Sequence, residues 1–471
     1  MIQTGCLIAG RRLNDGAVLR VRNPYNGDLV GEVFQASATD IDEAMQAALT
    51  LNTELTRYAR SEILMKARAQ LIARKEEFAK LITSESGLCI RETLYEVGRA
   101  ADVLQFSAIE ALRDDGQMFS GDVSPQGKSR KIFTLREPLN LVAAITPFNH
   151  PLNQVAHKVA PAIAVGAPVI LKPSEKTPLT ALAFAELLYE CGLPAPMLSV
   201  VLGKTEEVAG RLVQDPRTDL VTFTGSVAVG KRIAATAGYK KIVLELGGND
   251  PLIILDDADM ETAVTLAAEG SFRNSGQRCT AVKRILVHEA IHHAFVEKFV
   301  AKAREYVAGD PTDPNTRVGT VIDEASAMAL QSVVEEAKAE GAKVLLGGGR
   351  RGAQIEPTVI DNVSRAARMV CSESFGPLAP IMTIKGLDDA IELANSTDYG
   401  LSSGVVTQSL ESALACVRRL KAGTVNINEV PGYRIESSPF GGIKDSGLGI
   451  KEGVIEAMKA MTYVKTFSLP W

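Results

Sequence analysis

The 471-residue sequence lacks any run of eighteen uncharged apolar residues, and its first residues, 1–11, lack a basic start followed by a long apolar stretch. Neither a membrane-spanning helix nor a secretion signal is therefore expected, and the sequence predicts a cytoplasmic protein. Long basic runs are absent too, and the formal net charge is −5. Because nucleic-acid-binding proteins usually carry a basic surface, nucleic acid is not an expected partner.

Cysteine is scarce, and its spacing lacks the C-x-x-C pairs and nearby histidines of zinc sites, so we expect reduced thiols and no metal. The cysteines are Cys6, Cys89, Cys191, Cys279, Cys371 and Cys416. A free cysteine is usually a small buried hydrophobe, so a role for any one of them needs support from its surroundings.

The composition indicates a globular protein, because 46% of the residues are hydrophobic and 23% are charged. The length is too great for one ordinary core and predicts two or three domains with a cleft between them.

Residues 140–246 alternate short apolar runs with helical stretches. We expect strands at 141–145, 169–171, 198–202, 220–223 and 241–246, with helices at 152–164, 179–190, 226–237 and before Gln214. Strands separated by helices of this length pair in parallel with helices on both faces, which predicts a doubly wound α/β sheet.

Other segments flank this sheet. A second α/β alternation begins at Pro251, with helices at 260–269, 291–306 and 325–340, and N-terminal helices are expected at 41–51, 61–84 and 94–113. The segment Thr39-Asp-Ile-Asp is expected to open the first of these helices. Two isolated strands, 129–136 and 463–469, are expected to pair with each other or with another subunit.

Two strand ends have features of a nucleotide site. Residues 222–230 join a strand to a helix through Gly225 and Ser226, and free amides at a helix N-terminus suit a pyrophosphate. The neighbouring strand ends in Lys172-Pro-Ser-Glu175, where the acid could accept ribose hydroxyls and repel an added phosphate. Simple helix capping and a solvated Lys/Glu pair are the alternatives.

Three further positions carry candidate chemistry. Cys279 lies in a polar, glycine-containing loop, where a thiolate could act as a nucleophile. Glu245 ends an apolar strand, where desolvation would raise its pKa towards that of a general base. Asn149 ends another strand and could stabilise an oxyanion. An incidental loop cysteine and a turn-forming asparagine are the alternatives.

Seven short motifs, in order over nearly the whole chain, resemble those of the aldehyde dehydrogenase superfamily. They are Pro147-Phe-Asn149, Lys172-Pro-Ser-Glu175, Phe223-Thr-Gly-Ser226, Glu245-Leu-Gly-Gly248, Gly276-Gln-Arg-Cys279, Glu373-Ser-Phe-Gly-Pro377 and Pro439-Phe-Gly-Gly442. One such tetrapeptide is weak evidence, whereas the ordered set is specific.

The resemblance implies roles for these residues. Cys279 is the implied nucleophile, Asn149 and the Cys279 amide the oxyanion hole, and Glu245 the base that activates the hydrolytic water. Lys172 and Glu175 would hold the adenosine ribose, Ser226 the pyrophosphate and Glu373 the nicotinamide ribose. The implied cofactor contacts are Thr146, Pro147, Phe148, Lys172, Ser174, Glu175, Gly225, Ser226, Leu246, Glu373 and Phe375.

The resemblance also implies a three-part α/β subunit and a homodimer or homotetramer. The expected parts are a doubly wound parallel-sheet NAD-binding domain (1–117 and 138–246), a second α/β catalytic domain (247–454) and a small β oligomerisation arm (118–137 and 455–471). NAD is the expected cofactor, because Glu175 disfavours the extra phosphate of NADP, the less favoured alternative.

The expected reaction is thiolate attack on an aldehyde, hydride transfer to the nicotinamide and hydrolysis of the resulting thioester. The acylating branch of the family passes the acyl group to coenzyme A instead. Glu245 at the base position argues against that branch.

The expected substrate is a small anionic aldehyde, because Arg278 directly precedes the nucleophile and a guanidinium suits phosphate, phosphonate or carboxylate. A structural ion pair is the alternative for Arg278. The candidate substrate contacts are Arg99, His150, Arg278, Thr280 and Arg434, of which Arg434 is the weakest.

Several fragments resemble the branch of the family that oxidises phosphonoacetaldehyde to phosphonoacetate in phosphonate catabolism. They are residues 148–157, 276–283, 432–436 and 465–471. Branches for glyceraldehyde 3-phosphate, succinate semialdehyde, lactaldehyde and sulfoacetaldehyde share much of this pattern and are the alternatives.

Overall fold

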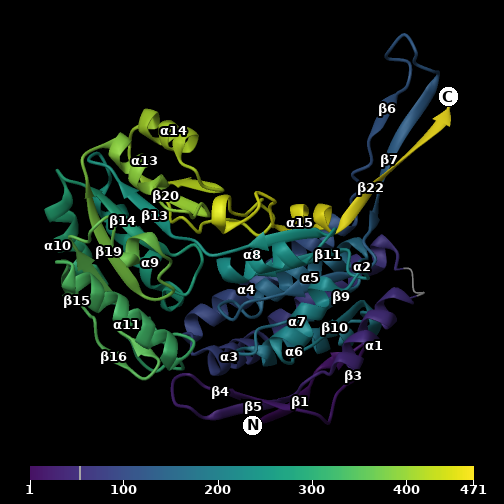
Figure 1. Cartoon of the computed structure of the whole chain (residues 1–471), viewed down its shortest axis with the longest axis horizontal. Coiled ribbons are helices and arrows are strands. Elements are labelled where there is room, and N and C mark those ends of the chain that lie inside the picture. The colour runs from purple at the N-terminus through teal and green to yellow at the C-terminus, as the bar shows by residue number, and fades with distance from the viewer. Residues whose placement is uncertain (52–54) are drawn as a thin grey trace.

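The computed structural model describes residues 1–51 and 55–471. Two lobes, each built around a sheet, lie side by side, and an arm of strands extends away from one of them (Figure 1). Residues 52–54, which belong to the predicted first domain, lie outside the described residues. Within the described ranges, no helix is both long and apolar enough to cross a membrane.

The sheet of the first lobe confirms the predicted doubly wound arrangement. Its order is β12 (Lys241–Glu245), β11 (Leu220–Thr224), β8 (Val142–Ile145), β9 (Val169–Lys172), β10 (Leu198–Val200), β2 (Leu7–Ile8) and β3 (Arg11–Arg12). The strands from β12 to β10 are parallel. The N-terminal strands β2 and β3 extend the sheet in antiparallel fashion and were not among the expected strands.

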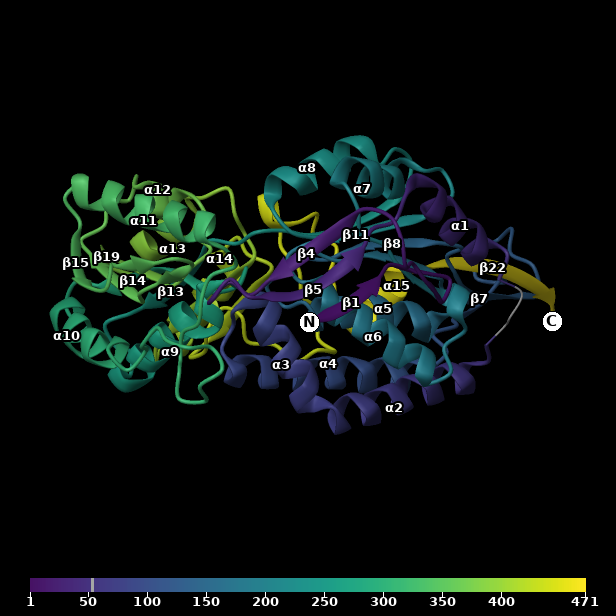
Figure 2. The ribbon, with the colours of Figure 1, turned by 90° about the horizontal axis from the view of Figure 1, so that it is seen from below.

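Helices cover both faces of this sheet, as Figure 2 shows. They are α1 (Ala38–Leu49), α7 (Thr205–Gln214) and α8 (Val227–Thr236) on one face, and α5 (Asn153–Val165) and α6 (Pro178–Glu190) on the other. The remaining N-terminal helices, α2 (Arg57–Ala73), α3 (Lys75–Ser86) and α4 (Ile90–Ala111), pack against α5 and α6. The sheet is therefore buried on both faces, as expected for parallel strands.

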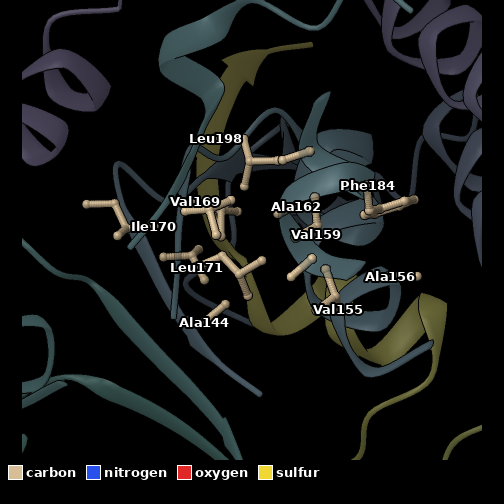
Figure 3. Close-up of a cluster of buried hydrophobic side chains, with 14 of the residues drawn as sticks. Ala144, Val155, Ala156, Val159, Ala162, Val169, Ile170, Leu171, Phe184 and Leu198 are labelled. Atoms are coloured by element: carbon tan, nitrogen blue, oxygen red, sulfur yellow. The ribbon is translucent and has the colours of Figure 1, made fainter. Parts of the chain in front are cut away.

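One part of the core of this lobe lies between β9 and the helices α5 and α6 (Figure 3). Val169 and Leu171 of β9 are buried with Val159 of α5 and Phe184 of α6. Burial of each such side chain stabilises the fold by about 1.5–3 kcal/mol relative to exposure. The loops at the carboxyl ends of β8 and β9 therefore start from a buried part of the sheet.

The second lobe has a sheet of mostly parallel strands. Its order is β15 (Lys343–Leu346), β18 (Thr358–Asp361), β19 (Leu378–Ile384), β14 (Val282–His288), β13 (Asp250–Ile254), β20 (Ser402–Val406) and β21 (Thr424–Ile427). Its helices are α9 (Met260–Phe272), α10 (His292–Ala303), α11 (Glu324–Ala339), α12 (Arg368–Cys371), α13 (Leu387–Asn395) and α14 (Leu410–Arg419). The predicted second alternation is confirmed.

The arm consists of β6 (Met118–Ser120), β7 (Arg130–Pro138) and β22 (Thr462–Pro470), and β22 follows α15 (Val454–Ala460). The two strands expected to lack local partners pair with each other in antiparallel register, from Thr462 opposite Pro138 to Pro470 opposite Arg130. Phe133 and Phe467 stack across this pair, with ring centroids 5.3 Å apart.

The structure corrects three local expectations. The helix expected over 61–84 is divided at Arg74, whose backbone (φ −102°, ψ 21°) ends α2 before α3 begins. The first helix begins earlier than Thr39, because Ser37 caps it in a reciprocal capping box with Asp40. Unpredicted strands β1 (Ile2–Gly5), β4 (Val18–Arg22) and β5 (Leu29–Phe34) form a separate small sheet.

Candidate active site

A cavity of about 580 Å³ lies where the loops after β8, β11 and β12 meet the second lobe. Carboxyl ends of parallel strands are the usual place for a ligand in such a fold. The predicted site residues that line it are Pro147, Phe148, Asn149, Gly225, Ser226, Glu245, Leu246, Cys279, Glu373 and Phe375. The fold therefore brings together all three predicted catalytic residues and most of the predicted cofactor contacts.

The loop that carries Cys279 follows α9 and makes an unusual turn. Asn274 and Ser275 adopt left-handed backbone conformations (φ 56° and 53°), followed by Gly276 at φ 68°. A Cβ at Gly276 would lie 2.1 Å from the carbonyl oxygen of Gly376, so glycine is required for this close approach. Backbone strain of this kind persists where the surrounding structure fixes it.

Asn149 is joined to this loop by two hydrogen bonds. Its Nδ2 donates to the carbonyl oxygen of Gln277 at 2.9 Å, and Asn274 Nδ2 donates to the carbonyl oxygen of Asn149 at 3.1 Å. The loop after β8 and the Cys279 loop are thus held in one arrangement. A side-chain amide nitrogen has a second hydrogen, which leaves one donor for a developing oxyanion.

The Cys279 thiol is partly buried, and its burial raises the thiol pKa to about 12. The carboxylates of Asp250 and Glu373 raise this pKa further, whereas the Arg434 guanidinium lowers it. Burial and these carboxylates therefore favour the neutral thiol over the thiolate in the free protein.

Glu245 ends β12 and is buried, and both of its carboxylate oxygens lack a hydrogen-bond partner in the described part of the chain. Burial raises its pKa well above the usual value, and the nearby Glu452 raises it further. A Cβ added at Gly441 would lie 2.5 Å from Glu245 Oε1. Glycine at this position therefore leaves room for the carboxylate. A carboxylate with an elevated pKa is a stronger base than an exposed one.

The N-terminus of α8 has the features of a phosphate site. Ser226 occupies the N-cap position without a side-chain capping bond, which leaves its hydroxyl and the first amides of the helix available. Gly225 N donates to the carbonyl oxygen of Glu245 at 3.1 Å and so ties this junction to the end of β12. These groups fit the pyrophosphate of a dinucleotide.

Glu373 and Phe375 line the opposite side of the cavity. Glu373 Oε1 accepts a hydrogen bond from Gly248 N at 3.2 Å, and burial raises the Glu373 pKa to about 7. Phe375 packs edge-on against Phe148, with ring centroids 5.8 Å apart. A carboxylate beside a paired aromatic surface fits a ribose and a flat ring.

Four predicted cofactor contacts do not line the cavity. Thr146 N donates to the carbonyl oxygen of Lys172 at 3.1 Å across the neighbouring strand ends. Lys172 Nζ lies 2.9 Å from Glu175 Oε1, and Ser174 Oγ accepts from the amide of Lys176. These residues lie at the carboxyl ends of the neighbouring strands β8 and β9.

The predicted substrate contacts also lie outside the cavity lining. Arg278 Nη2 donates to the carbonyl oxygens of Glu269 and Gly270 at 3.1 and 2.7 Å, at the C-terminal end of α9. Arg278 forms no ion pair within residues 1–51 and 55–471. The structure therefore does not support the alternative of a structural ion pair. Burial lowers the Arg278 pKa to about 10, and Arg273 lowers it further.

The other cationic candidates differ in their partners. Arg99 forms an ion pair with Glu436, which also contacts His157 Nε2. Arg434 stacks on Phe440, with its Cζ 3.8 Å from the ring centroid.

His150 and Thr280 stand beside these groups. His150 Nδ1 lies 3.6 Å from Glu96 Oε2. Thr280 lies close to Gly432: a Cβ added at Gly432 would lie 2.4 Å from Thr280 Oγ1. The charges of Arg99 and Cys279 both affect the pKa values of Arg278 and Arg434, which shows that these groups share one neighbourhood.

Several cavity residues were not predicted. Ser326, Ala329, Leu330 and Val333 present one face of α11, and Arg368 lies on α12. The further unpredicted lining residues are Gln154, Thr224, Gly247, Gln277, Ser372 and Ser374. The sequence predicted a helix over 325–340 but carried no signal that one face of this helix lines the cavity.

The sequence model of the Aldehyde dehydrogenase family matches residues 13–467. A 3-sulfolactaldehyde dehydrogenase from Priestia aryabhattai is 40% identical over 461 residues, covering 98% of this chain and 96% of that protein. A sulfoacetaldehyde dehydrogenase from Neptuniibacter caesariensis is 36% identical over 449 residues, covering 94% and 98%.

Solved structures share the fold. Aldehyde dehydrogenase 21 from Physcomitrella patens, in complex with the reaction product succinate, superposes with a TM-score of 0.96 at 38% identity, covering 99% of this chain and 98% of that one. An NADP-dependent glyceraldehyde-3-phosphate dehydrogenase from Bacillus halodurans, complexed with NADP, gives 0.96 at 33% identity, covering 100% and 99%. An NAD-dependent aldehyde dehydrogenase from Sinorhizobium meliloti gives 0.95 at 34%, covering 99% and 95%.

Proposed function

Because this chain belongs to the aldehyde dehydrogenase family, whose members are oxidoreductases, we propose that it oxidises phosphonoacetaldehyde to phosphonoacetate with NAD in phosphonate catabolism. The observation that carries the choice of an anionic substrate is Arg278. Its guanidinium stands one residue before Cys279 and binds two backbone carbonyls, with no carboxylate partner in the described residues. Its positive charge is therefore available to a substrate anion.

In this proposal the Cys279 thiol loses its proton to solvent water, and the resulting thiolate attacks the aldehyde carbon to form a thiohemiacetal. The Asn149 amide and the Cys279 backbone N–H stabilise its oxyanion. Glu245, whose pKa is raised by burial, accepts a proton from the water that hydrolyses the thioester. The carboxylic acid product and the free thiol result. No acceptor such as coenzyme A is needed.

The bound dinucleotide would accept the hydride that the thiohemiacetal loses. The α8 N-terminus with Ser226 would hold its pyrophosphate, Glu373 the nicotinamide ribose and Lys172 with Glu175 the adenosine ribose. We favour NAD because Glu175 would repel a 2′-phosphate. The family neighbours named above include both NAD-dependent and NADP-dependent enzymes, so NADP remains the alternative.

The cationic groups near Cys279 support a doubly charged head group. Arg278 and Arg434 make no ion pair among the described residues, whereas Glu436 balances the charge of Arg99. Two unbalanced guanidinium groups suit a phosphonate dianion. In the proposal His150 and Thr280 complete the pocket.

A second candidate substrate is 3-sulfolactaldehyde, which the 40% identical relative is named for. Its sulfonate would also bind guanidinium groups, but it carries a single negative charge.

Steady-state turnover of an aldehyde panel, with NAD and with NADP, tests the proposal. The panel comprises phosphonoacetaldehyde, 3-sulfolactaldehyde, sulfoacetaldehyde, succinate semialdehyde, glyceraldehyde 3-phosphate, lactaldehyde and uncharged propionaldehyde. We expect the highest kcat/KM for phosphonoacetaldehyde. A higher value for any other anionic aldehyde would reject phosphonoacetaldehyde while keeping the anionic class, and preference for propionaldehyde would reject both.

We further propose that the domain boundaries given in the sequence analysis hold and that the arm joins subunits into a cytoplasmic homodimer or homotetramer. The arm exposes apolar side chains, among them Phe119, Val464 and Leu469. Exposed apolar strands of this kind favour pairing with a partner. Light scattering of the full chain, compared with a chain lacking 463–471, measures the assembly.

A further inference from the structure

Lys283 is the second residue of β14 and lies four positions after Cys279. Its side chain is 1% exposed. Its ammonium donates hydrogen bonds to the carbonyl oxygens of Gly276 at 2.8 Å and Ser374 at 2.5 Å, and it stands 5.1 Å from the centroid of the Phe375 ring. A buried cation is costly unless such partners compensate it, so the position has a specific requirement for a donor.

The two carbonyls belong to loops that are far apart in the sequence. Gly276 lies in the strained turn that carries Cys279. Ser374 lies between Glu373 and Phe375, which line the other side of the cavity. One ammonium thus joins the two loops that face each other across the candidate reaction centre.

The titratable groups around Lys283 come from three parts of the chain. Glu373 faces it from the loop after α12, Arg278 and Cys279 from the loop after α9, and Asp250 from β13. Burial lowers the Lys283 pKa to about 8, with Glu373 opposing the shift and Arg278 adding to it. The ammonium therefore begins to lose its proton at mildly alkaline pH.

We propose that Lys283 is a positioning residue that holds the Cys279 loop and the Glu373–Phe375 loop in register, so that the thiol and the nicotinamide end of the cofactor meet in one fixed geometry. The inference rests on the proposed function in taking Cys279 as the nucleophile and the Glu373 loop as a cofactor contact. A misplacement of about 1 Å between reacting groups can reduce the rate by about 100-fold. A link between the loops therefore affects the chemical step more than substrate binding.

Lys444 provides a matched control. Its Nζ donates to the carbonyl oxygens of Asn395 at 3.0 Å and Thr397 at 2.8 Å, so it also joins two backbone carbonyls. Neither carbonyl belongs to the cavity lining. Lys283→Met and Lys444→Met remove the same chemical group in two places, and active-site titration of Cys279 corrects each variant for its folded fraction.

The first measurement is steady-state kinetics per titrated Cys279, with the best aldehyde of the panel. For Lys283→Met we expect kcat to fall about 10- to 100-fold, while the aldehyde KM changes less than about threefold. Lys444→Met should keep the kcat of the wild-type protein. An unchanged kcat per titrated thiol in Lys283→Met would show a purely structural lysine and overturn the proposal.

The second measurement does not depend on turnover. The rate of Cys279 alkylation by iodoacetamide, followed by peptide mass mapping, is compared with and without saturating NAD. We expect NAD to change this rate in the wild type and in Lys444→Met, and the effect to shrink at least about threefold in Lys283→Met. An equal NAD effect in all three proteins would reject the coupling of the loops, even if no aldehyde in the panel were turned over.

A third measurement uses Lys283→Arg, which keeps a cation at alkaline pH. In the wild type we expect kcat to decline as pH rises through about 8, because the ammonium loses its proton. The decline should shift to higher pH in Lys283→Arg, which should also recover kcat relative to Lys283→Met. An unshifted alkaline decline, or a Lys283→Arg protein no faster than Lys283→Met, would count against the cation as the holding group.

Discussion

Asn149 Nδ2 donates a hydrogen bond to the carbonyl oxygen of Gln277 at 2.9 Å, and this contact joins the two lobes beside Cys279. The donor comes from the loop after β8 and the acceptor from the loop after α9. Because Gln277 lies two residues before Cys279, the hydrogen bond fixes the amide relative to the thiol. An oxyanion donor is effective when its position is set before the reaction.

Replacement of this amide should slow the chemistry without preventing alkylation of the thiol. We expect Asn149→Ala to lower kcat by about 100- to 1000-fold, the usual effect of losing one oxyanion donor. The rate of Cys279 alkylation by iodoacetamide should change far less, because that reaction forms no oxyanion. Asn26→Ala, at an exposed turn, is the control. A similar loss in both reactions would indicate a displaced loop rather than a lost donor.

Glu245→Gln should separate the two halves of the reaction. The amide is nearly isosteric but cannot accept a proton, so the thioester should form and persist. We expect one equivalent of NADH per titrated Cys279 in a rapid burst, followed by turnover reduced at least about 100-fold. Stopped-flow absorbance at the NADH band measures both phases.

Glu245 should also determine how turnover of the wild-type protein depends on pH. The Glu245 pKa is raised well above its usual value, so the basic form increases as pH rises through that pKa. Turnover should therefore increase with pH on the acidic limb, and this limb should be absent from the residual rate of Glu245→Gln. Its persistence in the variant would assign the limb to another group.

The sequence predicted the polar residues that line the cavity better than the groups that hold those residues in place. Cys279, Glu245 and Asn149 each follow an apolar strand or helix, and short-range polar motifs at such ends are visible in the sequence. Their convergence on one cavity follows from the parallel order of the strands, which the alternation of β and α segments also indicates.

Contacts between distant segments could not be predicted from the sequence. Ser374 and Gly276 meet at Lys283 only because β14 and β19 are neighbours in the sheet, and no local pattern encodes that pairing. Arg74 interrupts a helical pattern that remains continuous in its apolar spacing, so the sequence predicted one helix there. The apolar face of α11 has the same pattern whether it meets a core or a ligand.

Glu175 is predicted to determine the choice of cofactor. Its carboxylate lies 2.9 Å from Lys172 Nζ and would repel a 2′-phosphate, whereas Lys172 alone would attract one. We expect Glu175→Ala to raise kcat/KM with NADP relative to NAD by about 10-fold, equivalent to about 1.4 kcal/mol. Glu207→Ala, which removes the acid of another lysine pair three residues apart, should leave the ratio unchanged. An unchanged ratio in Glu175→Ala would remove this residue from the cofactor site.

Arg278 is predicted to bind the anionic head group. Arg278→Ala should lower kcat/KM for phosphonoacetaldehyde by about 10- to 100-fold, because a charge-assisted hydrogen bond is lost. The value for propionaldehyde should stay within about threefold. Arg419→Ala, which removes an exposed arginine paired with Asp388, is the control. Equal losses on the two aldehydes would instead assign Arg278 to packing of the α9 end.

Glu436 is predicted to stabilise the folded chain in a pH-dependent way. Although burial opposes it, His157 and Arg99 hold the Glu436 pKa well below its usual value. Such a depressed pKa stabilises the fold above about pH 4.5 and loses this contribution as pH falls towards the folded-state pKa. Glu436→Gln should therefore lower the free energy of unfolding at pH 7.5 by about 3 kcal/mol and flatten the acid dependence of Tm below about pH 5. Asp389→Asn, at a more exposed pair with Arg365, should cost less than about 1 kcal/mol. Equal Tm losses in the two variants, measured by differential scanning calorimetry, would contradict a special contribution from the buried cluster.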